Sequence, residues 1–288
     1  MKLLRYGPPG QERPGIVDAR GDLRDLSAIV ADIDGEVLSP AGLTRLSELA
    51  LDTLPVVAGK PRLGVPVAGV PKFIAIGVNF RDHAIEAKMA IPSEPVVFMK
   101  ATSCLCGPDD DVITPKYATK MDWEVELGMV IGTKAQYVSV ERALDHVAGF
   151  CLINDVSERN FQLERGGQWD KGKSFDTFGP VGPWLVTRDE VGDAQDLDMW
   201  LAVNGERVQT GNSRTMIFDC ARIVSYLSEC MTLMPGDIIA TGTPPGVGMG
   251  MTPQRFLKPG DVMTLGVAKL GQQRQRVVPF PKREGSPS

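Results

Sequence analysis

The sequence predicts an α+β fold that is mostly β, and three features of the chain lead to this prediction. Apolar and acidic residues alternate through residues 122–128, and a period of two is typical of a β-strand. Apolar runs of strand length also occur at residues 73–79 and 149–156. Only residues 217–230 carry a clear amphipathic helical pattern, so strand-like segments dominate the chain.

Two units are expected, a small amino-terminal α/β domain at residues 1–69 and a larger domain at residues 70–288. Proline and glycine recur between residues 55 and 71, and such a stretch is extended and irregular, as domain boundaries often are. Within the first unit, Ser39 followed by Pro40 predicts the start of a short helix, with the serine as its cap.

Composition excludes several classes of function. The chain has 288 residues, a net charge of −5 and a pI near 5.2, so we expect no nucleic acid and no membrane as partner. No apolar run approaches the roughly 20 residues of a membrane span, and Pro8 interrupts the amino terminus too early for a signal peptide. An odd number of cysteines, five, favours a reducing, cytoplasmic location.

The alternating strand at residues 122–128 places two carboxylates, Glu124 and Glu126, on one face. Trp123, Val125 and Leu127 project from the other face. Two carboxylates about 7 Å apart repel each other unless a cation lies between them. The pattern therefore indicates either a metal site or the solvated face of an edge strand.

A third carboxylate, Asp155, ends the apolar run at residues 149–156. A buried aspartate is costly unless it is paired or bound to a metal, which favours the metal-site interpretation. Ser157 is expected to cap a short helix that follows. Three-residue spacing in that helix would place Arg159 and Gln162 on one side, where they could anchor a substrate carboxylate or carbonyl.

A possible general base lies in residues 80–89, which have helix-forming composition. Three-residue spacing puts His83 and Glu86 on the same helical face. A carboxylate beside an imidazole fixes its tautomer and stabilises the imidazolium, as a general base requires. The alternative is a surface ion pair on a polar helix.

Two further polar segments are candidates for substrate contacts. Lys173 lies in a polar, glycine-interrupted stretch and is either a surface lysine or a group that stabilises developing negative charge. Thr241 and Thr243 lie on a Gly/Pro loop after a strand, which lacks the Gly-Lys-Ser/Thr ending of a P-loop. Their hydroxyls could bind a substrate carboxylate.

The order of these motifs closely resembles that of the fumarylacetoacetate hydrolase superfamily. The matching segments are Asn79–His83, Glu124–Glu126, Asn154–Ser157, Gly172–Thr177 and Thr241–Pro244. The resemblance covers roughly residues 70 to 275 and is closest to members such as ureidoglycolate lyase, 2,4-diketo-3-deoxy-L-fuconate hydrolase and acylpyruvases. Phe80 departs from the pattern, because many relatives carry tyrosine there.

This resemblance implies a mixed β-roll catalytic domain, a smaller amino-terminal domain and a homodimer. It implies Mg²⁺ or Mn²⁺ held by Glu124, Glu126 and Asp155, and a His83–Glu86 dyad on a lid over the substrate. The residues that it places around the ligand are Lys173, Arg159, Gln162 and Thr243.

Such a site would suit a small-molecule 2-oxo acid, which chelates the ion through its carboxylate and keto oxygens. The metal would be a Lewis acid for the enolate formed when a C–C bond breaks. His83 would deprotonate a water that attacks a second carbonyl, and Lys173 would steady the negative charge. We therefore expect hydrolysis of a diketo acid, an acylpyruvate or a 2,4-diketo-3-deoxy sugar acid. The alternatives are oxaloacetate decarboxylation, isomerisation of a 2-hydroxydienoate, the ureidoglycolate lyase reaction and a catalytically idle metal-binding scaffold.

Overall fold

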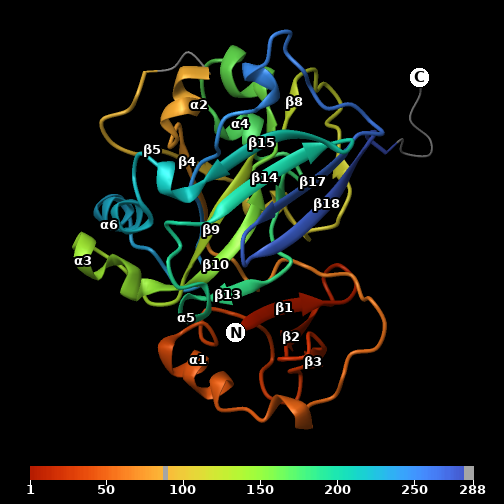
Figure 1. The fold of residues 1–288 in the computed structure, drawn as a ribbon, viewed down its shortest axis with the longest axis vertical. Helices are drawn as coiled ribbons and strands as arrows, with labels where there is room; N and C mark the ends of the chain where they lie inside the picture. The colour runs from red at the N-terminus through yellow and green to blue at the C-terminus, as the bar shows by residue number, and fades with distance from the viewer. Residues whose placement is uncertain (87–89, 282–288) are drawn as a thin grey trace.

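The computed structural model describes residues 1–86 and 90–281, and its backbone is dominated by strands (Figure 1). Strands hold 32% of the residues and helices 21%, which confirms the predicted mostly-β fold. The last part of the helix expected at residues 80–89 and the tail from residue 282 lie outside the described residues.

The larger of two main sheets has nine strands, and it holds the candidate site at its centre. In spatial order it contains β3 (Leu23–Asp25), β2 (Arg13–Val17), β1 (Lys2–Tyr6), β13 (Leu185–Thr187), β10 (Val147–Asn154), β9 (Val125–Ile131), β16 (Ile238–Ala240), β4 (Phe73–Gly77) and β5 (Val96–Lys100). Neighbouring strands are antiparallel except for β16 and β4, which are parallel.

The second main sheet has five strands and packs against the middle of the first. Its order is β15 (Glu206–Asn212), β14 (Asp198–Val203), β17 (Val262–Val267), β18 (Gly271–Val278) and β7 (Val112–Ile113). Strands β14 and β17 contact β9, and β17 and β18 contact β10. Fully buried side chains such as Leu127, Leu152 and Leu265 form the core that results.

Two short strand pairs, six α-helices and several short 3-10 or π-helical turns complete the described structure. The pairs are antiparallel β8 (Met121–Asp122) with β11 (Ser157–Glu158), and parallel β6 (Leu105–Cys106) with β12 (Gly179–Pro180). The helices are α1 (Pro40–Ser47), α2 (Arg81–Glu86), α3 (Val140–Ala143), α4 (Asp170–Lys173), α5 (Arg188–Val191) and α6 (Cys220–Cys230). Within residues 1–86 and 90–281, none of these helices is long and apolar enough to cross a membrane.

The helix predicted at residues 217–230 exists but begins later, at Cys220. Its cap is Asp219, whose carboxylate accepts the backbone N–H of Arg222 at 2.7 Å. Figure 1 shows α6 beside α3 at one side of the large sheet, and the two helices are in contact. An aspartate N-cap is a strong signal for the start of a helix, which the apolar spacing alone did not reveal.

The amino-terminal residues form three strands and helix α1, drawn in red and orange in Figure 1. Strand β1 pairs with β13, with Lys2 opposite Val186, so the large sheet runs from this unit into the rest of the chain. Arg62 makes a bidentate ion pair with Asp110, with N–O distances of 2.7 and 2.6 Å. The division after residue 69 therefore stays a prediction about folding units, since the two parts share one sheet.

The serines at the N-cap positions of α1 and α3, Ser39 and Ser139, give a matched stability test. Ser39 Oγ accepts the N–H of Gly42 at 3.1 Å, as predicted, whereas Ser139 makes no side-chain cap bond to α3. We expect Ser39→Ala to lower the free energy of unfolding by about 1 kcal/mol. Ser139→Ala should cost clearly less, and equal losses in urea unfolding would contradict this difference.

Candidate active site

The pairing of β9 with β10 brings three carboxylates together. Ile153 lies opposite Glu126 and Asn154 opposite Val125, so Asp155 reaches Glu124, whose carbonyl accepts the Asp155 N–H at 2.9 Å. One carboxylate oxygen from each of Glu124, Glu126 and Asp155 lies within 4.8 Å of the others. The solvated-edge alternative is wrong, because β9 lies between β10 and β16 and the two glutamates are 5% and 1% exposed.

Two buried lysines neutralise part of this acidic cluster. Lys173 Nζ lies 2.6 Å from Glu124 Oε2 and 2.6 Å from Asp155 Oδ2. Lys100 Nζ lies 2.5 Å from Asp155 Oδ1 and also donates to the carbonyl of Lys173. Both side chains are buried, so the surface-lysine alternative for Lys173 is wrong. Lys100 was not predicted as a site residue, because in the sequence it merely ends an apolar strand.

The three carboxylates differ in how well they are neutralised. Burial raises the pKa of the Glu124 carboxyl, but Lys173 and Arg159 outweigh burial and lower that pKa to about 2. Glu126 is held differently: burial, then the charges of Asp155 and Glu124, raise its pKa well above the usual value. Its Oε2 accepts the N–H of Gly242 at 2.7 Å. Glu126 is therefore the carboxylate whose repulsion by Glu124 and Asp155 a bound cation would relieve.

This donor set fits a hard divalent cation. Counting Asp122, four buried carboxylates face three buried cations, Lys100, Arg159 and Lys173. Clustered carboxylate oxygens are the ligands that Mg²⁺ and Mn²⁺ prefer. Glu124, Glu126 and Asp155 would hold the ion.

Lys173 reaches the cluster because a glycine precedes it. A Cβ on Gly172 would lie 2.5 Å from the backbone nitrogen of Gln162 and 2.5 Å from the carbonyl of Glu158. No side chain fits in that space, so only glycine lets α4 pack closely on the turn at residues 158–162. The close approach carries Lys173 into the carboxylate cluster.

The prediction that a helix starts directly after a Ser157 cap is wrong. Ser157 and Glu158 form strand β11 against Asp122 and Met121, and the Ser157 hydroxyl donates to the carbonyl of Asp155. Strand pairing to a distant segment outcompeted the local cap. A π-helical turn begins at Asn160, after Glu158 Oε2 accepts the N–H of Phe161 at 2.7 Å.

Asp122 links the carboxylate cluster to the loop at residues 246–249, a role that was not predicted from the sequence. Its carboxylate accepts Arg159 Nε at 2.9 Å, the Gly248 N–H at 2.7 Å and the Met249 N–H at 3.0 Å. A signal existed, because Asp122 shares strand parity with Glu124. Asp122 therefore fixes both the guanidinium and the loop at residues 246–249.

Arg159 and Gln162 lie together as predicted, and protein groups contact the guanidinium, although its Nη2 makes an ion pair without a hydrogen bond of good geometry. Besides Asp122, Arg159 contacts Glu124 Oε1 through Nη2 at 2.7 Å and donates from Nη1 to Gln162 Oε1 at 3.0 Å. Thr243 is similarly engaged: its hydroxyl donates to the carbonyl of Val125 at 2.9 Å. The roles of these residues as substrate anchors stay predictions.

His83 and Glu86 lie on α2, with Nδ1 and Oε2 3.4 Å apart. His83 is 6% exposed, so the surface-pair alternative does not hold for the imidazole. The Glu86 carboxylate also accepts the N–H of Gly246, at 3.0 and 3.1 Å from its two oxygens. The loop at residues 246–249, which Asp122 fixes, therefore also holds Glu86, the residue that orients the His83 imidazole.

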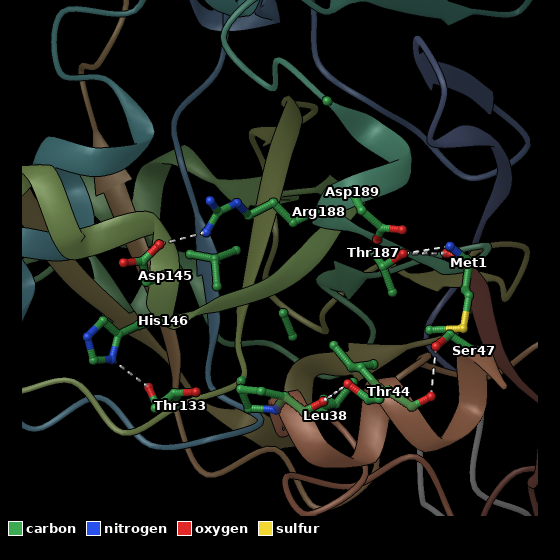
Figure 2. Close-up of a pocket in the computed structure, with 16 residues that line it drawn as sticks. Met1, Leu38, Thr44, Ser47, Thr133, Asp145, His146, Thr187, Arg188 and Asp189 are labelled. Atoms are coloured by element: carbon green, nitrogen blue, oxygen red, sulfur yellow. Dashed lines mark hydrogen bonds and ion pairs between the residues drawn. The ribbon is translucent and has the colours of Figure 1, made fainter.

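His83, Glu124, Glu126, Lys173 and Thr243 line one small cavity of about 30 Å³. A space of this size holds about two waters. A larger cleft of about 600 Å³ lies between α1 and the segments around His146 and Arg188 (Figure 2). Its walls carry pairs such as Arg188 with Asp145, and the triad is not among its lining residues. The chemistry therefore belongs to the smaller cavity.

A buried carboxylate triad beside a lysine and an imidazole–carboxylate pair is the arrangement expected of a metal-assisted enzyme site. The chain belongs to the fumarylacetoacetate hydrolase family, since the model described as "Fumarylacetoacetate (FAA) hydrolase C-terminal" matches residues 72–278. This result confirms the resemblance seen in the sequence at the level of the family.

Individual relatives agree over nearly the whole chain. A Burkholderia cenocepacia protein named "Putative hydrolase" is 63% identical over 276 residues, 96% of this chain and 98% of that one. A probable 2-hydroxyhepta-2,4-diene-1,7-dioate isomerase from Mycobacterium abscessus is 34% identical, with a TM-score of 0.82, covering 98% and 100%. Maleylpyruvate hydrolase from Sphingobium sp. SYK-6, in complex with manganese(II) and pyruvate, is 31% identical, with a TM-score of 0.81, covering 98% and 100%.

The Asp122–Arg159 pair should contribute far more to stability than an exposed pair of the same type. Asp122→Asn removes the charge that faces a buried guanidinium, and we expect a loss of about 3–5 kcal/mol in the free energy of unfolding. Asp145→Asn is the control, because Asp145 pairs with Arg142 in solvent and its loss should cost far less. Similar losses in urea unfolding would contradict the structural role given to Asp122.

Proposed function

We propose that this chain is a divalent-metal-dependent hydrolase that cleaves a C–C bond in a 2,4-diketo acid, of the acylpyruvate or diketo-deoxy sugar acid type. The observation that carries the proposal is that Glu124, Glu126, Lys173 and His83 line one cavity, with Asp155 clustered against the two glutamates. The similar maleylpyruvate hydrolase was described with manganese(II) and pyruvate, a 2-oxo acid. We extend the same ligand class to this site, with Mg²⁺ or Mn²⁺ as the ion.

The charges of the site favour an anionic substrate. With a divalent cation beside the four carboxylates and three cations, the site would carry one net positive charge. A substrate carboxylate would cancel it, which is favourable in a buried, weakly screened space. A bound cation would supply Lewis acidity to the carboxylate and keto oxygens of such a substrate.

The side chains can divide the proton and charge transfers between them. His83, oriented by Glu86, would take a proton from the water that attacks the second carbonyl. The ammonium of Lys173 has three N–H groups, and Glu124 and Asp155 accept two of them. Its third N–H is available to a negative oxygen on the substrate. Arg159, Gln162 and Thr243 would complete the walls around the ligand.

Substrate entry requires a movement, because a diketo acid is much larger than a space of about 30 Å³. Helix α2 covers the cavity with His83, and its carboxyl-terminal Glu86 is held by the Gly246 N–H. Releasing that contact would let α2 move away from the carboxylates. We therefore propose that α2 is the lid implied by the family resemblance.

An isomerase is the second candidate, since a 34% identical neighbour of the same fold is described as a probable 2-hydroxyhepta-2,4-diene-1,7-dioate isomerase. Decarboxylation and the ureidoglycolate lyase reaction would also use a site that stabilises an enolate or related anion. The contact between the buried His83 and Glu86 at 3.4 Å disfavours an idle metal-binding scaffold. A homodimer in the cytoplasm remains part of the proposal, and light scattering would test the dimer.

Glu126→Gln tests the metal assignment. It removes the least neutralised carboxylate, so we expect Mn²⁺ affinity in calorimetry to fall by about 100-fold or more. The metal-free melting temperature should not decrease, because repulsion among the carboxylates is relieved. Asp155→Asn is the matched contrast: it deprives two buried lysines of a partner and should destabilise the metal-free protein. Unchanged Mn²⁺ affinity in Glu126→Gln would remove Glu126 from the ligand set.

His83→Ala separates hydrolysis from decarboxylation. If His83 activates water, turnover of a diketo acid should fall by roughly 10²–10⁴-fold. Oxaloacetate decarboxylation needs no attacking water and should fall much less, and the dissociation constant for oxalate should change little. Glu86→Gln should be milder, because it disturbs the imidazole orientation without removing the base. Equal loss of both activities in His83→Ala would mean that His83 acts on the enolate or the lid instead.

A further inference from the structure

Resting on the proposed function, we propose that this site selects 2-oxo acids whose tail is apolar and uncharged, and that Trp169 is the main residue that sets this preference. Of the two substrate types left open above, an acylpyruvate with a hydrocarbon tail is then favoured over a hydroxylated sugar acid. The inference comes from the apolar side chains that line the cavity.

The cavity is lined by both charged and apolar side chains. Glu124, Glu126 and Lys173 are among the charged ones, and apolar side chains come from five separate segments. These apolar residues, here called the apolar wall, are Ile76, Val78, Phe98, Leu163, Trp169 and Met249. A substrate whose 2-oxo acid end binds the metal cluster would place its tail against this apolar wall. Apolar surface gains most from covering by a hydrocarbon tail.

Trp169 is held in place by close packing on both sides. Its ring meets Phe98 edge to face, with centroids 5.4 Å apart. On Gly77 a Cβ would lie only 2.3 Å from Trp169 Cζ3, so the indole occupies the space that any other residue at position 77 would fill. Gly77 ends strand β4, and Phe98 is buried in β5. The indole is therefore a built part of the wall.

A charged tail would compete with protein carboxylates for the basic side chains of the described lining. Within residues 1–86 and 90–281, the basic side chains that line the cavity are His83, Arg159 and Lys173. Each already contacts a carboxylate of the protein, Glu86 for His83 and Glu124 for both Arg159 and Lys173. A second substrate carboxylate beside the apolar wall would therefore have to share a counter-charge, which makes its burial unfavourable.

A hydroxylated tail is also poorly matched. The polar lining side chains besides the charged groups are Gln162 and Thr243. Gln162 Oε1 accepts from Arg159, and the Thr243 hydroxyl donates to Val125 and accepts from Gln209 at 2.8 Å. The Gln162 amide nitrogen could donate to a sugar hydroxyl, but a tail with several hydroxyls would lose more hydrogen bonds to water than the described lining restores. The wall thus discriminates by desolvation.

Two ligands of equal length test the preference without depending on turnover. 2-Oxohexanoate and 2-oxoadipate share six carbons and the same 2-oxo acid end, but one tail ends in a methyl group and the other in a carboxylate. Oxalate, which has no tail, is the reference. In calorimetry with Mn²⁺ present, 2-oxohexanoate should bind at least about tenfold more tightly than 2-oxoadipate.

Two matched variant pairs assign the preference to the wall. Trp169→Ala should weaken 2-oxohexanoate about tenfold and leave oxalate within about twofold. The control is Trp200→Ala, because Trp200 lies in β14 outside the cavity lining and should change neither ligand. Leu163 is 38% exposed, so Leu163→Arg can add a cation at the wall and should favour 2-oxoadipate, whereas Leu163→Gln should not.

Binding of 2-oxoadipate as tight as that of 2-oxohexanoate would overturn the inference. So would equal loss of oxalate and 2-oxohexanoate in Trp169→Ala, since that variant would then act on the metal end. Failure of oxalate itself to bind would overturn both this inference and the proposed ligand class. Pyruvate release measured on acylpyruvates separates the two: binding selectivity without cleavage would refute only the hydrolase, and cleavage without tail selectivity would refute only this inference.

Discussion

The double ion pair of Lys173 with Glu124 and Asp155 is the interaction on which the rest of the site depends. Two carboxylates this close in a buried space would repel strongly, and a single ammonium at 2.6 Å from each makes their proximity possible. Its geometry requires the β9–β10 register that aligns the acids and Gly172, which lets α4 approach. Lys100 pairs with the other carboxylate oxygen of Asp155, Oδ1. Sheet pairing and electrostatics are thus one constraint.

The same charge cluster is mechanically connected to the dyad. Asp122 holds Arg159 on one side and the N–H groups of Gly248 and Met249 on the other. Two residues earlier, Gly246 donates to Glu86, which in turn lies 3.4 Å from His83. The orientation of the imidazole therefore depends on a loop that is itself fixed by a carboxylate of the cluster. Movement of α2 would break the Gly246 contact with Glu86, a contact that involves no carboxylate of the triad.

The sequence was informative where chemistry is local and uninformative where it depends on distant pairing. Strand parity correctly placed Glu124 and Glu126 on one face, and the apolar run before Asp155 correctly indicated a buried acid. Lys100 escaped prediction because it meets Asp155 across 55 positions of sequence. Ser157 looked like a cap, but β11 pairs with β8, a partner that periodicity cannot identify. The pairing of β1 with β13 was hidden for the same reason.

The small size of the cavity explains why charged and apolar side chains line it together. At about 30 Å³ it admits little more than the water that a hydrolysis consumes, so little bulk solvent reaches the charges. Excluding water strengthens the attraction of Lys173 for an anionic substrate. Trp169 and Phe98, which pack edge to face, help to exclude that water. An enolate formed there would be stabilised by fixed groups rather than by solvent, which is the condition under which oriented charges lower a reaction barrier most.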